Sequence, residues 1–274
     1  MPVASTAENE FPPPGFSPSF HPMKLPLTTL VDAMQAELHV AAIADYSAAH
    51  NGLQLANRSG QVGKVAAAVD ASLPVIEKAC AAGAQLLLVH HGMFWSGVQM
   101  ITGGMFEKLR LAMEHDMAIY SVHLPLDYHP VLGNNAELGR ACGLRDPQEF
   151  GDGKLCGLKY ETNQTREAFA AVVQQAVGGG RVHVCAAGPA RVRHVGIITG
   201  GAGSEVATVA RFGIDTFLTG EGPHWSYPLA EELGINVLYA GHYATETFGV
   251  KALAGWLEKD YGLPWEFIDH PTGL

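Results

Sequence analysis

A strand, a helix and a second strand follow one another closely near residue 70 of this 274-residue chain. Residues 64–71, KVAAAVDA, form the continuous apolar run that is typical of a buried strand. Residues 72–84 have a serine at a helix-cap position, a proline in the first turn and a glycine near the end. QLLLVHHG, residues 85–92, is the next buried strand. Because a helical crossover joins parallel strands, this unit predicts an α/β fold with a mainly parallel sheet.

The same alternation continues along the chain, with a break at the glycines of residues 151–153. We therefore expect two three-layer α/β lobes, residues 28–150 and residues 151–274, whose segments could be consecutive or intertwined. AQLLLVHHGMFW (84–95) and DTFLTGEGPHW (215–225) resemble each other, which either chance or an internal duplication of related lobes would explain. Further helices are expected at residues 28–40, 106–115, 135–142, 165–177, 205–212, 227–233 and 247–257.

The first 27 residues differ in composition from the rest of the chain. Residues 11–20 read FPPPGFSPSF, and such proline-rich sequence forms neither a helix nor a central strand. A basic stretch followed by an apolar one is missing, so we do not expect a signal peptide. Residues 1–27 are therefore predicted to be a flexible N-terminal extension.

Composition narrows the classes of protein to which the chain can belong. Hydrophobic residues make up 47% of the sequence, enough for a large core. The net charge of -10 argues against nucleic acid as a partner, because phosphate binding needs a basic surface. Apolar stretches are shorter than the roughly 18 residues of a membrane span, so no membrane partner is expected. Four scattered cysteines without a C-x-x-C pair fit reduced thiols in a cytoplasmic protein.

Polar residues with metal-binding side chains follow three of the strand-like runs, LLLV, IYSV and NVLYAG. Ligands gather beyond the carboxyl ends of the strands in α/β sheets, so these side chains can converge. Imidazole and carboxylate together suit zinc, iron or manganese. Five ligands exceed what one catalytic zinc takes, which predicts two divalent ions bridged by a carboxylate. The five predicted ligands are His90, His91, Asp127, His242 and Glu246.

Each of these residues also has a purely structural explanation. A single histidine at a strand end is more often a hydrogen-bonded structural residue, and Glu246 could simply favour a helix dipole. Successive side chains of a strand point to opposite faces, so His90 and His91 bind together only if the chain turns, which Gly92 permits. The joint occurrence of all five favours the metal site. Residues that could orient ligands or move protons are His123, Glu221, His224 and Tyr243.

Other catalytic motifs are missing from the sequence. It contains no G-x-S-x-G, no G-x-x-x-x-G-K-[ST] and no G-x-G-x-x-G after a strand. The run GGAG at residues 200–203 could line a phosphate-binding turn, although a tight turn explains it more simply.

Five segments together resemble the Nif-three-like family of dinuclear-metal-centre hexameric proteins, whose members are often named GTP cyclohydrolase one type two. They are ADYSAAHNGLQ, LLLVHHGMFW, YSVHLPLD with NNAELGRACGL, FLTGEGPHW and GHYATETFGV. The resemblance implies the same five metal ligands, a site in the cleft between two α/β lobes, and a homo-hexamer built as a trimer of dimers. Many members have proline where this chain has Gly92, and residues 1–27 have no counterpart.

These features predict a metal-dependent hydrolase that acts on a nucleotide, phosphoester or cyclic amide-like substrate through a metal-bridged hydroxide. His123 and Glu221 are the predicted catalytic residues, which would move protons. One alternative is a protein that stores or delivers iron or zinc without turnover. Another is a ring-shaped regulatory scaffold. A fold and a metal site do not by themselves identify a substrate.

Overall fold

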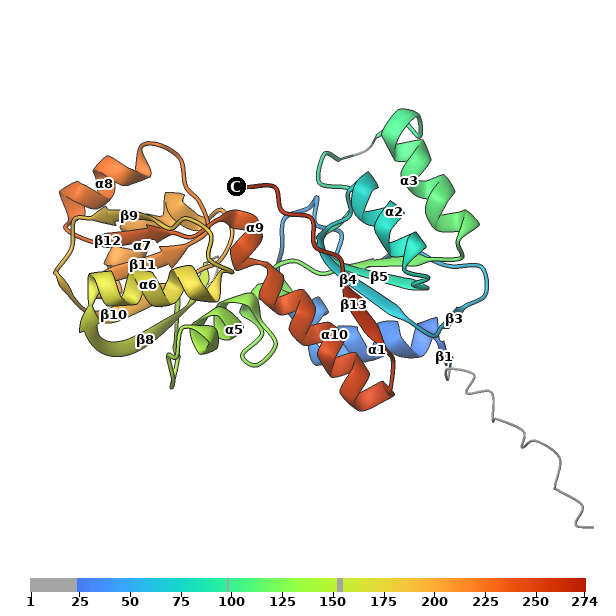
Figure 1. Ribbon diagram of the computed structural model, residues 1–274, viewed down its shortest axis with the longest axis horizontal. Coiled ribbons are helices and arrows are strands. Elements are labelled where there is room, and N and C mark those ends of the chain that lie inside the picture. The colour runs from blue at the N-terminus through green and yellow to red at the C-terminus, as the bar shows by residue number, and fades with distance from the viewer. Residues whose placement is uncertain (1–23, 98, 152–154) are drawn as a thin grey trace, which may run out of the picture.

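The computed structural model describes residues 24–97, 99–151 and 155–274. These residues form two α/β lobes that lie side by side (Figure 1). Most of the predicted N-terminal extension falls outside the described residues. Its last residues do not extend from the fold: Leu25–Pro26 (β1) pairs with Gln61–Val62 (β3), and Leu27 begins the first helix.

The sheet of the first lobe has five strands in the order β13-β4-β5-β6-β2. The first four run parallel and β2 is antiparallel at the edge, which confirms the mainly parallel sheet predicted here. The strands are Trp265–Phe267 (β13), Val65–Asp70 (β4), Leu86–His91 (β5), Ala118–Ser121 (β6) and Gly52–Leu55 (β2).

Alternation along the strands produces the three layers of this lobe. Leu86 and Leu88 of β5 pack against α1 (Leu27–Glu37) and α10 (Thr247–Tyr261) on one face. Leu87 and Val89 pack against α2 (Leu73–Ala81) and α3 (Gly103–Glu114) on the other. All four side chains are fully buried, and each such burial stabilises the fold by about 1.5–3 kcal/mol. Both faces of β5 are therefore apolar, which explains its uninterrupted LLLV.

The sheet of the second lobe has six strands in the order β7-β8-β10-β11-β12-β9. Its centre, β10 to β12, is parallel, whereas β7, β8 and β9 join antiparallel. The strands are Gln148–Gly151 (β7), Cys156–Thr165 (β8), Arg191–Ile197 (β10), Thr216–Thr219 (β11), Asn236–Tyr239 (β12) and His183–Ala186 (β9). Helices cover both faces, α5 and α6 on one and α7 and α8 on the other. They are Asn134–Ala141 (α5), Arg166–Ala176 (α6), Val206–Ala210 (α7) and Ser226–Leu233 (α8).

The two lobes are interleaved along the chain. Helix α5 precedes residue 150 but packs on the second sheet, against Tyr160 of β8. Helix α10 and strand β13 follow residue 150 but pack on the first sheet, beside β4. The chain therefore crosses between the lobes more than once, and these crossings hold the lobes together.

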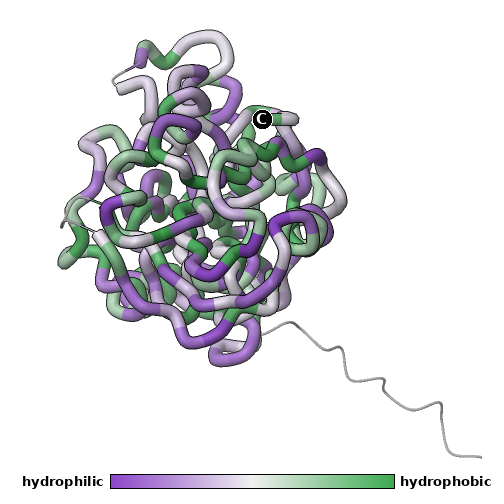
Figure 2. The backbone as a smooth tube through the Cα atoms, turned by 90° about the vertical axis from the view of Figure 1, so that its left-hand side faces the viewer, coloured by the Kyte–Doolittle hydropathy of each residue, from purple (hydrophilic) through white to green (hydrophobic). Residues whose placement is uncertain are grey.

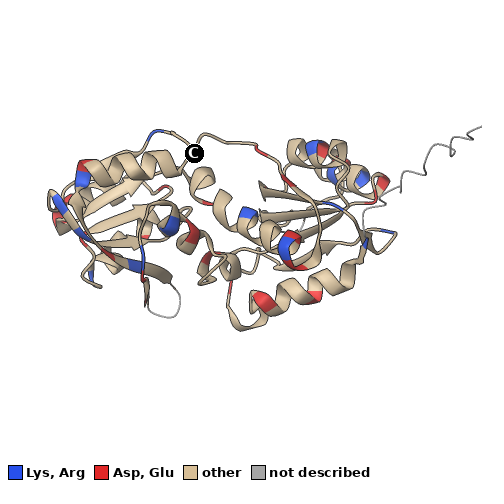
Figure 3. Ribbon diagram, turned by 60° about the horizontal axis from the view of Figure 1, so that its bottom comes forward, with Lys and Arg blue, Asp and Glu red and all other residues tan. Residues whose placement is uncertain are grey.

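Hydrophobic and hydrophilic residues occupy different parts of the structure. Hydrophobic stretches concentrate inside the molecule and hydrophilic ones follow its outer loops (Figure 2). Charged residues of both signs are spread over the outer helices and loops of the two lobes (Figure 3). Among the helices that the structure describes, a stretch long and apolar enough to cross a membrane is not found.

Two local expectations differ from the structure. The helix expected at residues 205–212 is a 3-10 turn, Ala202–Glu205 (η2), followed by the short α7. Ser72 precedes α2 as expected, but its side chain makes no capping hydrogen bond. Thr165 before α6 does cap its helix, accepting a hydrogen bond from the Ala168 N–H.

Candidate metal centre

Strand β5 ends with His90 and His91, and both imidazoles reach one cluster. Their ring centroids are 4.8 Å apart, and His90 is completely buried. The strand ends at His91 and turn residues start at Met93, but the glycine at position 92 is not needed for a left-handed backbone conformation. Its φ is not in the left-handed region, but a Cβ there would overlap the Gln54 carboxamide. Glycine is needed because this carboxamide packs there and accepts a hydrogen bond from the Met93 N–H.

The remaining predicted ligands come from two short helices beyond the strand ends. Asp127 lies on α4 (Leu124–Tyr128), which follows β6. His242 starts α9 (His242–Thr245), which follows β12, and Glu246 lies between α9 and α10. A spacing of four residues places His242 and Glu246 on the same side of the chain. Segments more than 150 residues apart therefore meet between the two sheets, as predicted.

The Glu246 carboxylate is the centre of the cluster. It is buried, and its Oε1 lies 3.6 Å from Nε2 of His90. Its Oε2 lies 3.4 Å from Nε2 of His91 and 3.1 Å from Nε2 of His242. Asp127 Oδ2 lies 3.5 Å from the same nitrogen of His90. Two of the sets of potential ligands contain a carboxylate, His91 with His242 and Glu246, and His90 with Asp127 and Glu246. Glu246 belongs to both.

In each histidine ring, Nδ1 points away from the cluster and contacts an oxygen atom. His90 Nδ1 lies 3.0 Å from the Val122 carbonyl oxygen, and His91 Nδ1 lies 2.9 Å from Asp70 Oδ1. His242 Nδ1 lies 2.8 Å from Glu221 Oε1. These acceptors require a proton on Nδ1, so a neutral ring presents the lone pair of Nε2 to the cluster. This is the usual arrangement of metal-binding histidines, in which the acceptor behind the ring sets its tautomer and orientation.

His123 is held in the same way and lies at the cluster. Its Nδ1 lies 2.8 Å from Asp45 Oδ1, and Asp45 Oδ2 accepts hydrogen bonds from Asn51 Nδ2 and the Leu124 N–H. Potential ligand atoms of His90, His91 and His123 lie within 4.8 Å of one another. His123 is therefore placed either to bind or to exchange a proton with a group at the cluster.

Asp127 and Glu246 are positioned by neighbours from the second lobe. The buried Asn134 donates to Asp127 Oδ1 at 2.8 Å, and Thr199 Oγ1 lies 3.2 Å from the same oxygen. Gly200 has a φ of +67°, and a Cβ there would overlap Glu246 Oε1. The first glycine of the GGAG run is thus needed for close approach to Glu246 as well as for its turn.

The pKa values show how strongly these charges interact. Burial would lower the pKa of His90, but the carboxylates of Asp127 and Glu246 outweigh burial and raise it to about 9. His242, next to Glu246 and Glu221, also has its pKa raised to about 9 against the effect of burial. Burial would raise the pKa of Glu246, and the surrounding histidines instead hold it well below its usual value. The cluster is thus a set of buried acids and bases that strongly favour one another's charged forms.

Two buried atoms of the cluster, Nε2 of His90 and Oε2 of Glu246, have ion-pair neighbours at 3.1–3.6 Å but make no well-oriented hydrogen bond with a described residue. A buried polar atom without a partner is costly, so native proteins rarely leave one. Both atoms face the cluster, and a divalent cation would satisfy both at once. The nitrogen and oxygen donors present here therefore fit divalent transition-metal ions.

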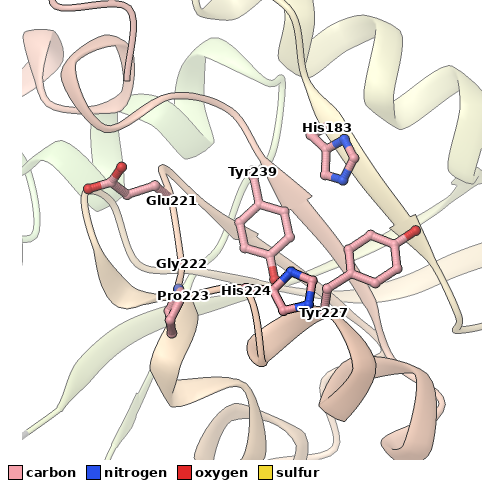
Figure 4. Close-up of a pocket in the computed structure, with 7 residues that line it drawn as sticks. All are labelled: His183, Glu221, Gly222, Pro223, His224, Tyr227 and Tyr239. Carbon is pink, nitrogen blue, oxygen red and sulfur yellow. The ribbon is translucent and has the colours of Figure 1, made fainter.

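The other predicted site residues lie at different distances from the cluster. Glu221 contacts the cluster only through the far side of His242, so it is placed to orient that ring. His224 lines a separate cavity of about 480 Å³, together with Glu221 and the rings of Tyr227 and Tyr239 (Figure 4). The Tyr243 hydroxyl bonds to Asp269 Oδ1 and to the His270 N–H. Among the described residues, the side chains of His224 and Tyr243 make no hydrogen bond to a predicted ligand, contrary to our expectation, although the Tyr243 carbonyl oxygen accepts one from the Glu246 N–H.

Sequence reasoning missed several residues that hold the ligands in place. Asp45 belongs to the ADYSAAHNGLQ segment, and Asp70 ends the strand next to β5. An acidic residue at the end of β4 could have been noticed, since β4 and β5 are consecutive parallel strands. Asn134, Thr199 and Gly200 gave no comparable signal, because their roles depend on the contact between the lobes.

A cavity of about 710 Å³ opens beside the cluster. Its lining includes His91, His123 and Glu246 from the cluster, together with residues of both lobes. A volume of this order is that of a pocket for a small organic molecule. The cluster is therefore accessible from a cavity that could hold a substrate.

Comparison with known proteins shows the family of the chain. Residues 26–272 match the family model described as Duf34/NIF3 (NGG1p interacting factor 3). The chain belongs to this family. A protein of Deinococcus radiodurans named GTP cyclohydrolase 1 type 2 homolog is 41% identical over 231 residues, covering 82% of this chain and 86% of that protein. A Halobacterium salinarum protein of the same name is 39% identical over 239 residues, covering 85% and 94%.

Solved structures of the family share the whole fold. The Thermus thermophilus protein TTHA1606 has a TM-score of 0.83 and 37% identity, covering 91% of this chain and 100% of that chain. A protein described as ybgI, of unknown function, has a TM-score of 0.84 and 35% identity with the same coverage. These matches confirm the resemblance and the α/β fold predicted from the sequence.

Proposed function

We propose that this DUF34/NIF3 family protein binds two divalent transition-metal ions and uses them to hydrolyse a small molecule. The observation that carries the proposal is the pair of ligand sets that share the buried Glu246. In this proposal, His91, His242 and Glu246 hold one ion, and His90, Asp127 and Glu246 hold the other. Zinc, iron and manganese all suit such mixed nitrogen and oxygen ligands.

When bound, two such ions would supply an activated water and stabilise a leaving oxygen. The residues of the chain provide the remaining functions. His123 lines the cavity and is held at Nδ1 by Asp45, so its Nε2 is suited to accept or return a proton. Asp45 fixes the tautomer and the orientation of the ring, as the carboxylate partner of a catalytic histidine does. Glu221 acts as a positioning residue for His242 rather than at the reacting atoms.

Metal content tests the ligand assignment directly. We expect about two ions per chain in metal-replete protein, measured by elemental analysis, since two ligand sets share Glu246. His242→Ala should remove one ion and His90→Ala the other, whereas Glu246→Ala should lower both. His115→Ala and Glu231→Ala, which alter exposed residues away from the cluster, serve as matched controls. Full metal content in the Glu246→Ala protein would contradict the assignment.

Turnover separates hydrolysis from metal storage, metal delivery and a scaffold role. A screen of nucleotides, phosphoesters and cyclic amides should yield a product with the wild-type protein. His123→Ala should abolish that product while the metal content stays at the wild-type level. If no compound is hydrolysed and the metal instead passes to an apo acceptor protein, metal delivery replaces hydrolysis. If neither occurs, the scaffold hypothesis remains.

We also propose a ring of six chains as the working assembly, as the family resemblance implies. Apolar side chains exposed on one region of the first lobe support self-association; they are Met100, Ile101, Phe106 and Met113. Light scattering of the full-length chain should then give about six times the 29.1 kDa mass of one chain. A mass near that of one chain at micromolar concentration would contradict the ring.

A further inference from the structure

The segment of residues 268–274 runs from the first lobe to α9, the short helix that begins with a predicted metal ligand. It follows β13, and the Ile268 N–H donates to the Ala67 carbonyl oxygen of β4 at 2.8 Å. Lys78 of α2 donates to the main-chain oxygen of Asp269, also at 2.8 Å. The other end of the segment lies beside α9 (Figure 1). It therefore spans the junction between the two lobes.

Tyr243 of α9 holds this segment at two points. Its N–H donates to the main-chain oxygen of Leu274 at 3.2 Å. Its hydroxyl donates to Asp269 Oδ1 at 2.9 Å and accepts a hydrogen bond from the His270 N–H at 2.8 Å. The tyrosine is buried, so breaking these contacts would cost free energy that water does not fully return. Both the start and the end of the segment are thus fixed to one residue.

Tyr243 also belongs to the turn that carries two of the ligands. It directly follows His242, and its carbonyl oxygen accepts a hydrogen bond from the Glu246 N–H at 3.2 Å. Helix α9 has only four residues, and a single helical turn is not stable by its own hydrogen bonds. Its position therefore depends on contacts with other segments. Thr245 and Glu221 tie the turn to the second lobe, whereas Tyr243 ties it to a segment that starts on the first.

We infer that residues 268–274 position the His242 turn for metal binding, and that they act through Tyr243 rather than as ligands. This inference rests on the metal function proposed above, because it concerns the ion assigned to His91, His242 and Glu246. His91 extends from the first sheet and His242 follows a strand of the second, so this ion binds well only if the two lobes hold a fixed relative position. The other ion does not use His242 and should depend less on the segment.

Zinc affinity measured separately for each ion tests the inference. In the His90→Ala protein only the ion assigned to His242 is expected, whereas the His242→Ala protein retains the other ion. Competition with a chromophoric chelator should show that deletion of residues 269–274 weakens the first ion about tenfold and the second less than about threefold. A merely destabilised fold would weaken both ions alike. Tyr243→Phe removes only the hydroxyl contacts, so it should weaken the first ion by a smaller factor even if the deletion impairs folding.

Hydrogen exchange in metal-free protein that is otherwise wild-type gives a second readout, which does not depend on bound ions. The amides of residues 242–246 should exchange about tenfold faster after the deletion, while those of β5 keep their rate. Tyr261→Phe, at the far end of α10, is the matched control and should change neither measurement. Unchanged exchange at residues 242–246, unchanged zinc affinity or equal weakening of both ions would overturn the inference. If even the wild-type protein binds no zinc, the proposed function fails instead, and exchange alone decides whether the segment positions the turn.

Discussion

At the scale of single residues, the geometry of the cluster depends on the hydrogen-bond partners that hold each ligand side chain in place. Four imidazoles have an oxygen at Nδ1, and Asp127 has an amide at Oδ1. These contacts fix the rings before any ion is present, so that little conformational entropy is lost when one binds. Gly200 adds a steric condition, because it leaves room for the Glu246 carboxylate.

Replacing Gly200 by alanine should therefore disable the cluster. The new Cβ would overlap Glu246 Oε1, and the residue would keep a φ of +67° that alanine rarely adopts. We expect a loss of roughly 2–4 kcal/mol in the free energy of unfolding, measured by denaturant titration, and a lower metal content. Gly201→Ala is the matched control, since its Cβ would make only ordinary contacts of 3.6–3.7 Å with His242. Equal metal content in the two variants would show that Glu246 does not depend on this glycine.

The raised pKa values predict that metal binding releases protons. At pH 7.5 the rings of His90 and His242 are positively charged in the metal-free protein, because their pKa values are about 9. Each ring then carries a proton on Nε2 in addition to the one on Nδ1. A metal at Nε2 displaces that proton, so full loading should release about two protons per chain. The metal affinity should rise with pH and level off above pH 9. Calorimetry in buffers of different ionisation enthalpy measures the release.

The same groups give the metal-free protein the opposite pH dependence. A histidine with a raised pKa stabilises the fold fully below its ordinary value near 6.5, and this contribution disappears as the pH rises through 9. Metal-free protein should thus lose stability between pH 6.5 and 9, whereas metal-bound protein should not. A metal-free unfolding free energy that rises over this range would contradict the assigned interactions.

The five potential ligands were predictable because each follows a recognisable strand. Their supporting residues were less accessible to sequence reasoning. The contact between Asp70 and His91 depends on the register of β4 against β5, in which these two residues are opposite each other. Asp45 reaches His123 across 78 residues of chain, and only the folded loop brings the two together. Local patterns specify strands and helices, whereas such contacts depend on how those elements pack.

At the scale of elements, short helices at the strand ends deliver the ligands, and one asparagine ties them together. Asn134 at the start of α5 donates to Asp127 on α4 and accepts from the Gly249 N–H of α10 at 2.6 Å. An amphipathic pattern predicts α10 as a helix but does not say which sheet it covers. That is why the sequence left open whether the lobes are consecutive or interleaved.

Asn134→Ala should loosen the junction of α4, α5 and α10. It leaves the buried Gly249 N–H without a hydrogen bond and removes one of the two hydrogen bonds that Asp127 Oδ1 accepts, which together cost roughly 2–4 kcal/mol of unfolding free energy. Metal affinity should fall most for the ion assigned to His90 and Asp127. Asn163→Ala, a position away from the cluster, is the control. Denaturant titration and metal competition measure the two effects, and wild-type values in both would exclude this role for Asn134.

At the scale of the whole molecule, the cluster lies where the two lobes meet. His90, His91 and Asp127 extend from strands of the first sheet, whereas His242 follows a strand of the second. Ions held by both groups would link the lobes. The cavity then takes one wall from each lobe, so its shape depends on the same link.

Removing the ions should therefore destabilise the entire chain rather than one loop. Binding to the folded state at about a thousand times Kd stabilises it by roughly 4 kcal/mol per site. At about 2–4 °C per kcal/mol for a chain of this size, stripping both ions with a chelator should lower Tm by roughly 10 °C or more. In Glu246→Ala, which lacks the residue shared by both sets, the chelator should have little effect. The measurement is differential scanning calorimetry on protein whose metal content is known before and after treatment. An unchanged Tm after proven loss of two ions per chain would mean that the lobes are held by their crossings α5, α10 and β13 alone, and that the ions serve only the chemistry of the cavity.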